Sequence, residues 1–222
     1  MTCLLRRSAK RLRTSLPMLT RSSVWALVLS ALLGCSACIA GGIDHKIDPR
    51  QDTGVWSRNY QNALYDLTLL TVWGGALWLG SDNRAGHTFW QAVDSTALGF
   101  ATAAVMKPVF SRSRPRQTDD PGDWFQGSGH NSFPSNEVMV LTTAVTPFVL
   151  EYGPEHPAVY ALELLPLYDA IARVKSQAHW QTDVLASLVI GTGIGWYAHE
   201  RALPISVKLL PRGITVGLHV RF

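Results

Sequence analysis

The chain has 222 residues, of which 47% are hydrophobic and 16% charged, with a formal net charge of +4. This length is enough for one domain with a substantial core. The positive charge is concentrated at the start, because six of the 20 basic residues lie in the first 21 positions and no acidic residue precedes Asp44. The remainder carries 14 basic against 16 acidic residues, so the composition argues against a nucleic-acid-binding protein.

Residues 1–40 have the pattern of a targeting segment. A basic stretch is followed by "VWALVLSALLGCSACIAGG", residues 24–42, whose apolar run has the length of a signal-peptide core and is short for a transmembrane helix. We predict a signal peptide cleaved after Ala40 or an uncleaved N-terminal anchor, while "LLGC" offers Cys35 as a lipidated residue. All three cysteines lie in this segment, so the rest of the chain has no disulfide framework.

Apolar segments of helical length fill the next part of the chain. Each contains an internal polar residue, and few reach 18 consecutive apolar positions, which favours core helices of an all-α bundle over membrane spans. Pro147 and Pro166 are expected to kink or break two of them. We therefore predict a helical domain over residues 41–204, with helices at about 60–80, 88–110, 135–152, 156–174 and 180–200.

Two further segments depart from this helical pattern. Residues 111–134 form a long polar loop, and a loop of this length in a compact domain is usually functional or disordered. Residues 205–222 read as strand, turn and strand, with apolar and polar residues alternating from Ile214 to Phe222. We predict a short C-terminal β-hairpin packed on the bundle.

Three motifs with chemically useful side chains occur in order between residues 107 and 183. The first is K-x6-R-P, the second is "FPSNE" and the third is R-x5-H-x3-D; their key residues are Lys107, Arg114, Pro115, Pro134, Ser135, Arg173, His179 and Asp183. In this order they resemble the type 2 phosphatidic acid phosphatase superfamily, which includes bacterial acid phosphatases and vanadium haloperoxidases. The pattern of that family has P-S-G-H in the second motif, where this chain has "PSNE".

The residue types themselves suit phosphoryl transfer, in which charge spreads over the phosphoryl oxygens. Lys107 supplies a point charge, and Arg114 and Arg173 supply planar forks that match phosphate oxygens. Ser135, a good helix N-cap, can donate its hydroxyl close to the backbone N–H groups of a helix start. Arg112 and Arg116 lie outside the pattern, and we expect them to be solvated charges or headgroup contacts.

The resemblance implies a role for each matched residue. His179 would be the nucleophile that forms a phosphohistidine, and Asp183, four residues later, would accept a hydrogen bond from one ring nitrogen and free the other. Lys107, Arg114, Ser135, Asn136 and Arg173 would bind the phosphate. The family needs no metal for this reaction, and the sequence contains no clear metal-ligand cluster or other cofactor signal.

Glu137 stands where the family has the histidine that protonates the leaving oxygen. A carboxylic acid can do this if it is protonated at the working pH. Burial and a nearby phosphate would raise the pKa of Glu137, whereas the basic side chains would lower it. Our leading hypothesis makes Glu137 the general acid, and the alternative is His130 of "GSGH". Asn136 replaces the family's glycine, and asparagine tolerates unusual backbone conformations better than most residues.

The sequence therefore predicts a metal-independent phosphatase of the bacterial cell envelope, periplasmic or attached to the membrane. Its substrate would be a phosphomonoester or pyrophosphate, either a lipid phosphate or a small organic phosphate. One alternative is a binding protein for phosphate or lipid phosphate that has lost its catalytic acid. A second is a vanadate-dependent haloperoxidase, although nothing in the chain points to halide chemistry.

Overall fold

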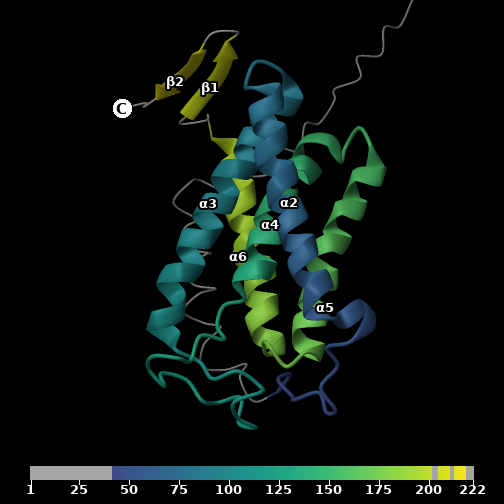
Figure 1. Cartoon of the computed structure of the whole chain (residues 1–222), viewed down its shortest axis with the longest axis vertical. Helices are drawn as coiled ribbons and strands as arrows, with labels where there is room; N and C mark the ends of the chain where they lie inside the picture. The colour runs from purple at the N-terminus through teal and green to yellow at the C-terminus, as the bar shows by residue number, and fades with distance from the viewer. Residues whose placement is uncertain (1–41, 202–204, 211–212, 219–222) are drawn as a thin grey trace, which may run out of the picture. The chain divides into compact units, whose positions relative to one another are not determined.

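The structure is a computed structural model that describes residues 42–201, 205–210 and 213–218. The body of the described chain is helical, which confirms the predicted all-α bundle (Figure 1). Its α-helices are α2 (Arg58–Leu79), α3 (Arg84–Phe110), α4 (Asn136–Tyr152), α5 (Leu164–Lys175) and α6 (Gln181–Glu200); the short 3-10 helices are η1 (Gly54–Trp56) and η2 (Pro157–Glu163).

Helix α4 is the central helix, with contacts to α2, α3, α5 and α6. Every residue from Val138 to Pro147 is buried, as expected for a helix that is apolar on all sides. Two glycines of α6 allow close packing against it: a Cβ at Gly191 would lie 2.8 Å from Cβ of Thr142, and one at Gly195 would lie 2.5 Å from Cβ of Thr146. The second half of α6 is thereby held against the middle of α4.

The helix boundaries agree with the sequence prediction to within a few residues, except in one segment. Helix α4 continues through Pro147 without a break. The segment predicted at 156–174 is instead divided into η2 and α5 just before Pro166, where the missing N–H of proline is tolerated in the first helical turn. Among the described residues, no helix combines the length and the apolar character that crossing a membrane requires.

The loop between α3 and α4 folds back on the end of α3. Its backbone is tied there by Phe125 N–H donating to Phe110 O (2.9 Å) and Ser132 N–H donating to Arg112 O (2.9 Å). The rings of Phe110, Trp124 and Phe133 pack edge-to-face at centroid distances of 5.0 to 6.1 Å. This packing gives the loop a fixed course between two helix ends.

The two predicted C-terminal strands are present as β1 (Ile205–Leu210) and β2 (Gly213–Leu218). They pair antiparallel, with Val207 opposite Val216. The predicted packing of their side chains on the helices lies outside the described residues, as does the predicted leader over residues 1–40.

Candidate active site

The three motifs meet where four helix ends come together, at the end of the bundle drawn lowest in Figure 1. Lys107 lies in the last turn of α3, and Arg114 lies on the loop that follows it. Glu137 is in the first turn of α4, with Ser135 as its N-cap. Arg173 lies in the last turn of α5, and the third motif continues through a turn into α6. Residues 66 positions apart, Lys107 and Arg173, thus contribute to one site.

His179 is fully buried on the turn before α6, and its two ring nitrogens have different surroundings. Nδ1 lies 2.6 Å from the backbone carbonyl oxygen of Ser132. A carbonyl oxygen only accepts hydrogen bonds, so Nδ1 must carry the proton. Nε2 has no hydrogen-bond partner in the part of the chain that the structure describes. In the neutral form of the ring, Nε2 then carries the lone pair that a nucleophile requires.

Asp183 does not orient His179 in the predicted way. Its Oδ2 lies 3.7 Å from Nδ1 of His179, too far for a hydrogen bond. The carboxylate instead accepts from the Ser132 hydroxyl (2.5 Å), from Nη1 of Arg112 (2.6 Å) and from the backbone N–H of Trp180 (2.9 Å). Burial raises the pKa of Asp183, but the nearby imidazole of His179 and the charge of Arg112 outweigh it and hold that pKa below its ordinary value.

Arg112 corrects a second prediction, because it is neither solvated nor free to bind a headgroup. Its side chain is fully buried and forms ion pairs with both Asp44 (2.7 Å) and Asp183 (2.6 Å). Buried arginines need such partners, since an unpaired buried charge is costly. Arg116, by contrast, is exposed as expected.

Arg173 is buried between two carboxylates. Its Nε lies 3.2 Å from Oδ1 of Asp169, and its Nη1 lies 3.1 Å from Oε1 of Glu137. Burial raises the pKa of Asp169 to about 6, despite the Arg173 charge. Burial also acts to raise the pKa of Glu137, but the nearby imidazole of His179 and the charge of Arg173 outweigh it and hold that pKa well below its usual range. This lowered pKa favours the ionised form of Glu137 in this arrangement.

Three buried polar atoms in this site lack a hydrogen-bond partner among the described residues: the Ser135 hydroxyl, Nη2 of Arg173 and Nε2 of His179. Buried polar groups are rarely left without a partner. Ser135 is the N-cap of α4, as predicted, but its hydroxyl caps no backbone N–H. Each atom comes from a matched residue of the second or third motif. Two are hydrogen-bond donors suited to an anion, and the third is the predicted nucleophile.

Lys107 and Arg114 share one acceptor residue. Nζ of Lys107 donates to the backbone oxygen of Asn131 (2.8 Å), and Nε of Arg114 donates to its side-chain oxygen (3.0 Å). Burial lowers the pKa of Lys107 to about 8. The pKa of Arg114 is also lowered, first by burial and then by the nearby charge of Arg116. The positive charges of Lys107, Arg114 and Arg116 therefore repel one another, and this repulsion favours binding of an anion.

His130 and Asn136 have neighbours of different kinds. Nδ1 of His130 lies 2.9 Å from the Ser113 hydroxyl on the loop, whereas Oε2 of Glu137 lies 3.8 Å from Nε2 of His179. The described contacts thus bring Glu137 to the histidine. Asn136 begins α4 and lies close to Tyr65 of α2, whose pKa is raised chiefly by burial.

Sequence reasoning missed several residues that support the site: Asp44, Arg112, Ser132 and Asp169. Asp169 had a usable signal, because it precedes Arg173 by one helical turn. The other three are separated from His179 in sequence, so no local spacing reveals them. No cluster of three His, Cys, Asp or Glu side chains suited to a metal ion occurs in the described part of the chain.

Comparisons with known proteins identify the family of this chain. The family model of the PAP2 superfamily matches residues 88–203, just over half of the chain, and the chain belongs to this superfamily. The match includes all three motifs, from Lys107 to Asp183. The family prediction made from those motifs is therefore confirmed.

Two individual proteins are similar to parts of this chain. A stretch of 106 residues, 46% of this chain, is 31% identical to the "Lipid A 1-phosphatase" of Porphyromonas gingivalis and covers 22% of that protein. The chain thus spans about a fifth of the length of this curated relative. A solved structure titled the first transmembrane PAP2 type phosphatidylglycerolphosphate phosphatase from Bacillus subtilis aligns at a TM-score of 0.45 and 17% identity, over 80% of this chain and 92% of that one.

Proposed function

We propose that this protein is a phosphatase that hydrolyses a phosphomonoester or pyrophosphate through a phosphohistidine on His179, with no metal ion. The observation that carries this proposal is the set of three partnerless buried atoms on Ser135, Arg173 and His179. Two donors and one lone pair, surrounded by further cations, suit a phosphoryl group that gains charge on its oxygens during transfer.

Substrate binding must displace the Glu137 carboxylate. A reacting phosphorus atom has to approach to about 3–3.5 Å from the nucleophile, and Oε2 of Glu137 already lies 3.8 Å from Nε2 of His179. Its side chain is 30% exposed, so it has room to turn toward the mouth of the site. The phosphate then replaces Glu137 as the partner of Arg173.

The same displacement prepares Glu137 to act as the general acid. Away from Arg173 and beside an anionic phosphate, its carboxylate loses the interactions that depress its pKa, so it takes up a proton. A phosphate ester, whose second pKa is about 6, can supply that proton as its monoanion. His130 would take the role of the acid only if the loop moved it away from Ser113.

The reaction then proceeds in two balanced steps. In the first, Nε2 of His179 bonds to phosphorus, the bond to the leaving oxygen breaks, and that oxygen takes the Glu137 proton. In the second, water bonds to phosphorus, the nitrogen–phosphorus bond breaks, and the water proton passes to Glu137. Lys107, Arg114, Arg173 and the Ser135 hydroxyl hold the phosphoryl oxygens throughout, with Asn136 beside them.

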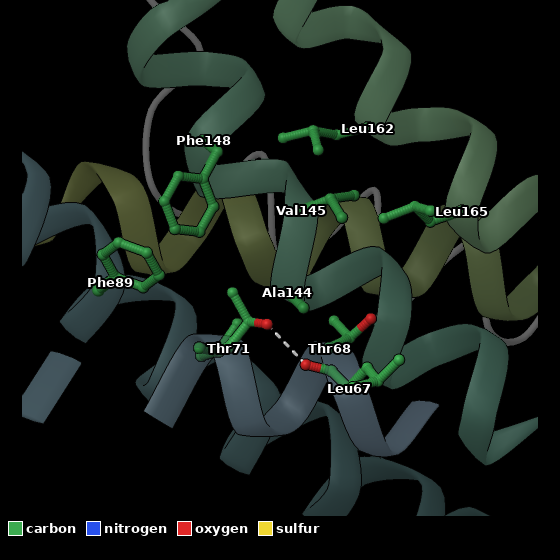
Figure 2. Close-up of a pocket in the computed structure, with 10 residues that line it drawn as sticks. Leu67, Thr68, Thr71, Phe89, Ala144, Val145, Phe148, Leu162 and Leu165 are labelled. Atoms are coloured by element: carbon green, nitrogen blue, oxygen red, sulfur yellow. Dashed lines mark hydrogen bonds between the residues drawn. The ribbon is translucent and has the colours of Figure 1, made fainter. Parts of the chain in front are cut away.

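We further propose that the substrate is a lipid phosphate and that the enzyme works at the membrane of the bacterial cell envelope. The name of the Porphyromonas gingivalis relative supports this. So does an apolar cavity of about 320 Å³ between α2, α3, α4, η2 and α5 (Figure 2). Its α4 residues Ala144, Val145 and Phe148 lie seven to eleven positions beyond Glu137, about 11–17 Å along the helix, within reach of an acyl chain.

Phosphate release by the full-length protein tests the activity. We would assay an activated aryl phosphate, an alkyl phosphate, a pyrophosphate and a long-chain lipid phosphate from pH 4 to 8, and search for a base-stable, acid-labile phosphohistidine. Turnover with this intermediate is the expected result. Turnover without any phosphohistidine would exclude His179 as the nucleophile.

Chain length tests the substrate. For the wild type we expect kcat/KM to rise with the acyl length of the substrate. Thr71 lies at the exposed rim of the cavity, and Thr71→Trp should lower kcat/KM for long-chain substrates but not for short ones. Equal turnover of all chain lengths, with no effect of Thr71→Trp, would point to a small organic phosphate instead.

A second candidate is a binding protein that holds phosphate without turnover. The ion pair between Glu137 and Arg173 favours it, because an ionised carboxylate in the anion site cannot donate a proton. This candidate predicts saturable phosphate binding and no release from any of the four substrates. The binding protein would be established over the phosphatase if the wild type bound phosphate without turnover and Arg173→Lys weakened this binding.

A further inference from the structure

The chain segment just before η1 lies against the turn that carries His179. Backbone N–H of Gln51 donates to Lys175 O (2.9 Å), and Nε2 of Gln177 donates to Ile47 O (2.7 Å). Farther along, Gln181 and His45 exchange two hydrogen bonds of 2.9 and 3.0 Å. Residues 43–51 thus cover the turn from Lys175 to Gln181, and we call them the N-terminal strap.

The covered turn has an unfavourable backbone conformation. Gln177, two residues before His179, has a φ of +55°, in the left-handed region that residues other than glycine seldom adopt. Such a conformation persists only where surrounding contacts determine it. The strap supplies contacts on both sides of this residue.

Asp44 is the buried anchor of the strap. Its Oδ1 accepts from the backbone N–H of Thr182 (2.8 Å), and its Oδ2 accepts from the Thr182 hydroxyl (2.6 Å) and from Nη2 of Arg112 (2.7 Å). Both oxygens are therefore used, one in capping the start of α6 and the other in binding an arginine.

Arg112 links Asp44 to the catalytic histidine. Its Nη1 donates to Oδ1 of Asp183 (2.6 Å) and its Nη2 to the Pro121 carbonyl oxygen (2.6 Å), while the Trp124 ring lies 4.3 Å from the guanidinium carbon. The other oxygen of Asp183 holds the Ser132 hydroxyl (2.5 Å), and the carbonyl of that same serine accepts from Nδ1 of His179 (2.6 Å). Each link is fully buried and within hydrogen-bond distance.

We propose that Asp44 is a positioning residue: through Arg112, Asp183 and Ser132 it fixes the Nδ1-protonated form and the orientation of His179. The physical reason is geometric. Arg112 is a rigid planar fork whose two nitrogens bind two carboxylates, so the position of one carboxylate sets that of the other. Asp183 in turn sets the Ser132 carbonyl that selects the tautomer. This inference rests on the proposed role of His179 as nucleophile.

Asp44→Asn in the full-length protein tests the proposal, because it keeps the size of the side chain and removes its charge. We expect kcat to fall by about 10- to 100-fold with KM little changed. Asp48→Asn is the matched control, since Asp48 lies in the same strap and is exposed; it is expected to leave kcat unchanged. Arg112→Lys, which keeps the charge but loses the fork, should behave as Asp44→Asn does, and the two changes should be non-additive.

Nitrogen NMR of the labelled histidine rings reads the position of the proton without any turnover. Spectra of His179→Gln protein identify the His179 signal. We expect a proton fixed on Nδ1 in the wild type and in Asp48→Asn, and a mixture of tautomers in Asp44→Asn. If Asp44→Asn does not fold, Asp44→Glu, which keeps the charge on a longer arm, makes the same test.

The two measurements separate this proposal from the proposed function. A wild type without phosphatase activity whose tautomer still depends on Asp44 would refute the activity and support the positioning role. Full kcat and an unchanged tautomer in Asp44→Asn or Asp44→Glu would overturn the positioning role, whatever the activity. Additive effects of Asp44→Asn and Arg112→Lys would also overturn it, because residues in one chain of contacts must be coupled.

Discussion

The two ends of α4 carry the same three residue types in different surroundings. At its start, the Glu137 carboxylate lies 3.1 Å from Nη1 of Arg173 and 3.8 Å from Nε2 of His179. Near its end, the Glu151 carboxylate bridges Arg84 (2.5 Å) and His199 (3.0 Å). Fourteen residues separate the two glutamates, about 21 Å along the helix.

Burial and spare bonding capacity distinguish the two clusters. The side chains of Arg173 and His179 are 3% and 0% exposed, against 47% and 21% for Arg84 and His199. At the far end Arg84 also binds Glu155 through two nitrogens, so its fork is occupied. Among the described residues, three buried atoms of the near cluster have no hydrogen-bond partner, namely Nη2 of Arg173, Nε2 of His179 and the Ser135 hydroxyl, against one atom of the far cluster, Nδ1 of His199. Residue types alone do not make a site; buried groups with unused bonding capacity do.

The two histidines should give the largest contrast. His179→Gln should lower kcat by at least about 10⁴-fold, since it removes the nucleophile, whereas His199→Gln should leave kcat within about twofold. Phosphate release and thermal unfolding of both variants provide the measurement. Equal losses in the two folded variants would contradict the contrast between the two ends.

The two arginines should differ by less. Arg173→Lys keeps a charge but loses the planar fork, and we expect kcat/KM to fall by about 10²-fold. Arg84→Lys should change kcat/KM by no more than about twofold, because exposed ion pairs contribute little. Inhibition by inorganic vanadate sharpens the comparison. Vanadate should inhibit Arg84→Lys as strongly as it inhibits the wild type, and it should inhibit Arg173→Lys only weakly. Vanadate inhibition that is the same in all three proteins would remove Arg173 from the phosphate site.

The two glutamates test the proton donor. Glu137→Gln should lower kcat/KM, which reports the first step, by about 10²-fold for the alkyl phosphate and far less for the activated aryl phosphate, because a good leaving group needs no acid. Glu151→Gln should affect neither ester selectively. If Glu137→Gln kept full activity on the alkyl ester, its role as the acid would be wrong, and His130→Gln would be the next variant to examine.

The smallest expected effect is a pH dependence from Lys107. Burial lowers its pKa to about 8, so its amine is charged below that pH and neutral above it. Since a neutral amine binds phosphate less well, kcat/KM should fall by about tenfold or less as pH rises through 8. Lys107→Arg, whose group stays charged, should shift this fall to higher pH. An alkaline limb that Lys107→Arg leaves in place would assign it to another group.

Much of the fold followed from patterns that are local in sequence. Apolar segments of helical length predicted the five long helices, because a helix must bury apolar side chains on a face repeating every 3.6 residues. Ser135 was placed at the start of α4 by its cap preference and the apolar run behind it. The motif spacings identified the superfamily, now confirmed by the match over residues 88–203.

The arrangement of the site was decided by tertiary structure. His179 lies on a turn and not on α6, so the four-residue spacing to Asp183 gave no hydrogen bond between them. Its true partner is a backbone carbonyl at Ser132, which no side-chain pattern can reveal. The burial of Arg112 arises only when residues 44, 112 and 183 come together.

The sequence by itself thus determined the superfamily and the side chains that we propose to bear the chemistry, and the tertiary structure decided their surroundings and hydrogen-bond partners. The ionised state of Glu137 illustrates the division. Its position in the second motif can be read from the sequence, but its pKa is the balance of burial against His179 and Arg173. Those opposing contributions depend on distances across the bundle, and such distances exist only once α4, α5 and α6 have packed together.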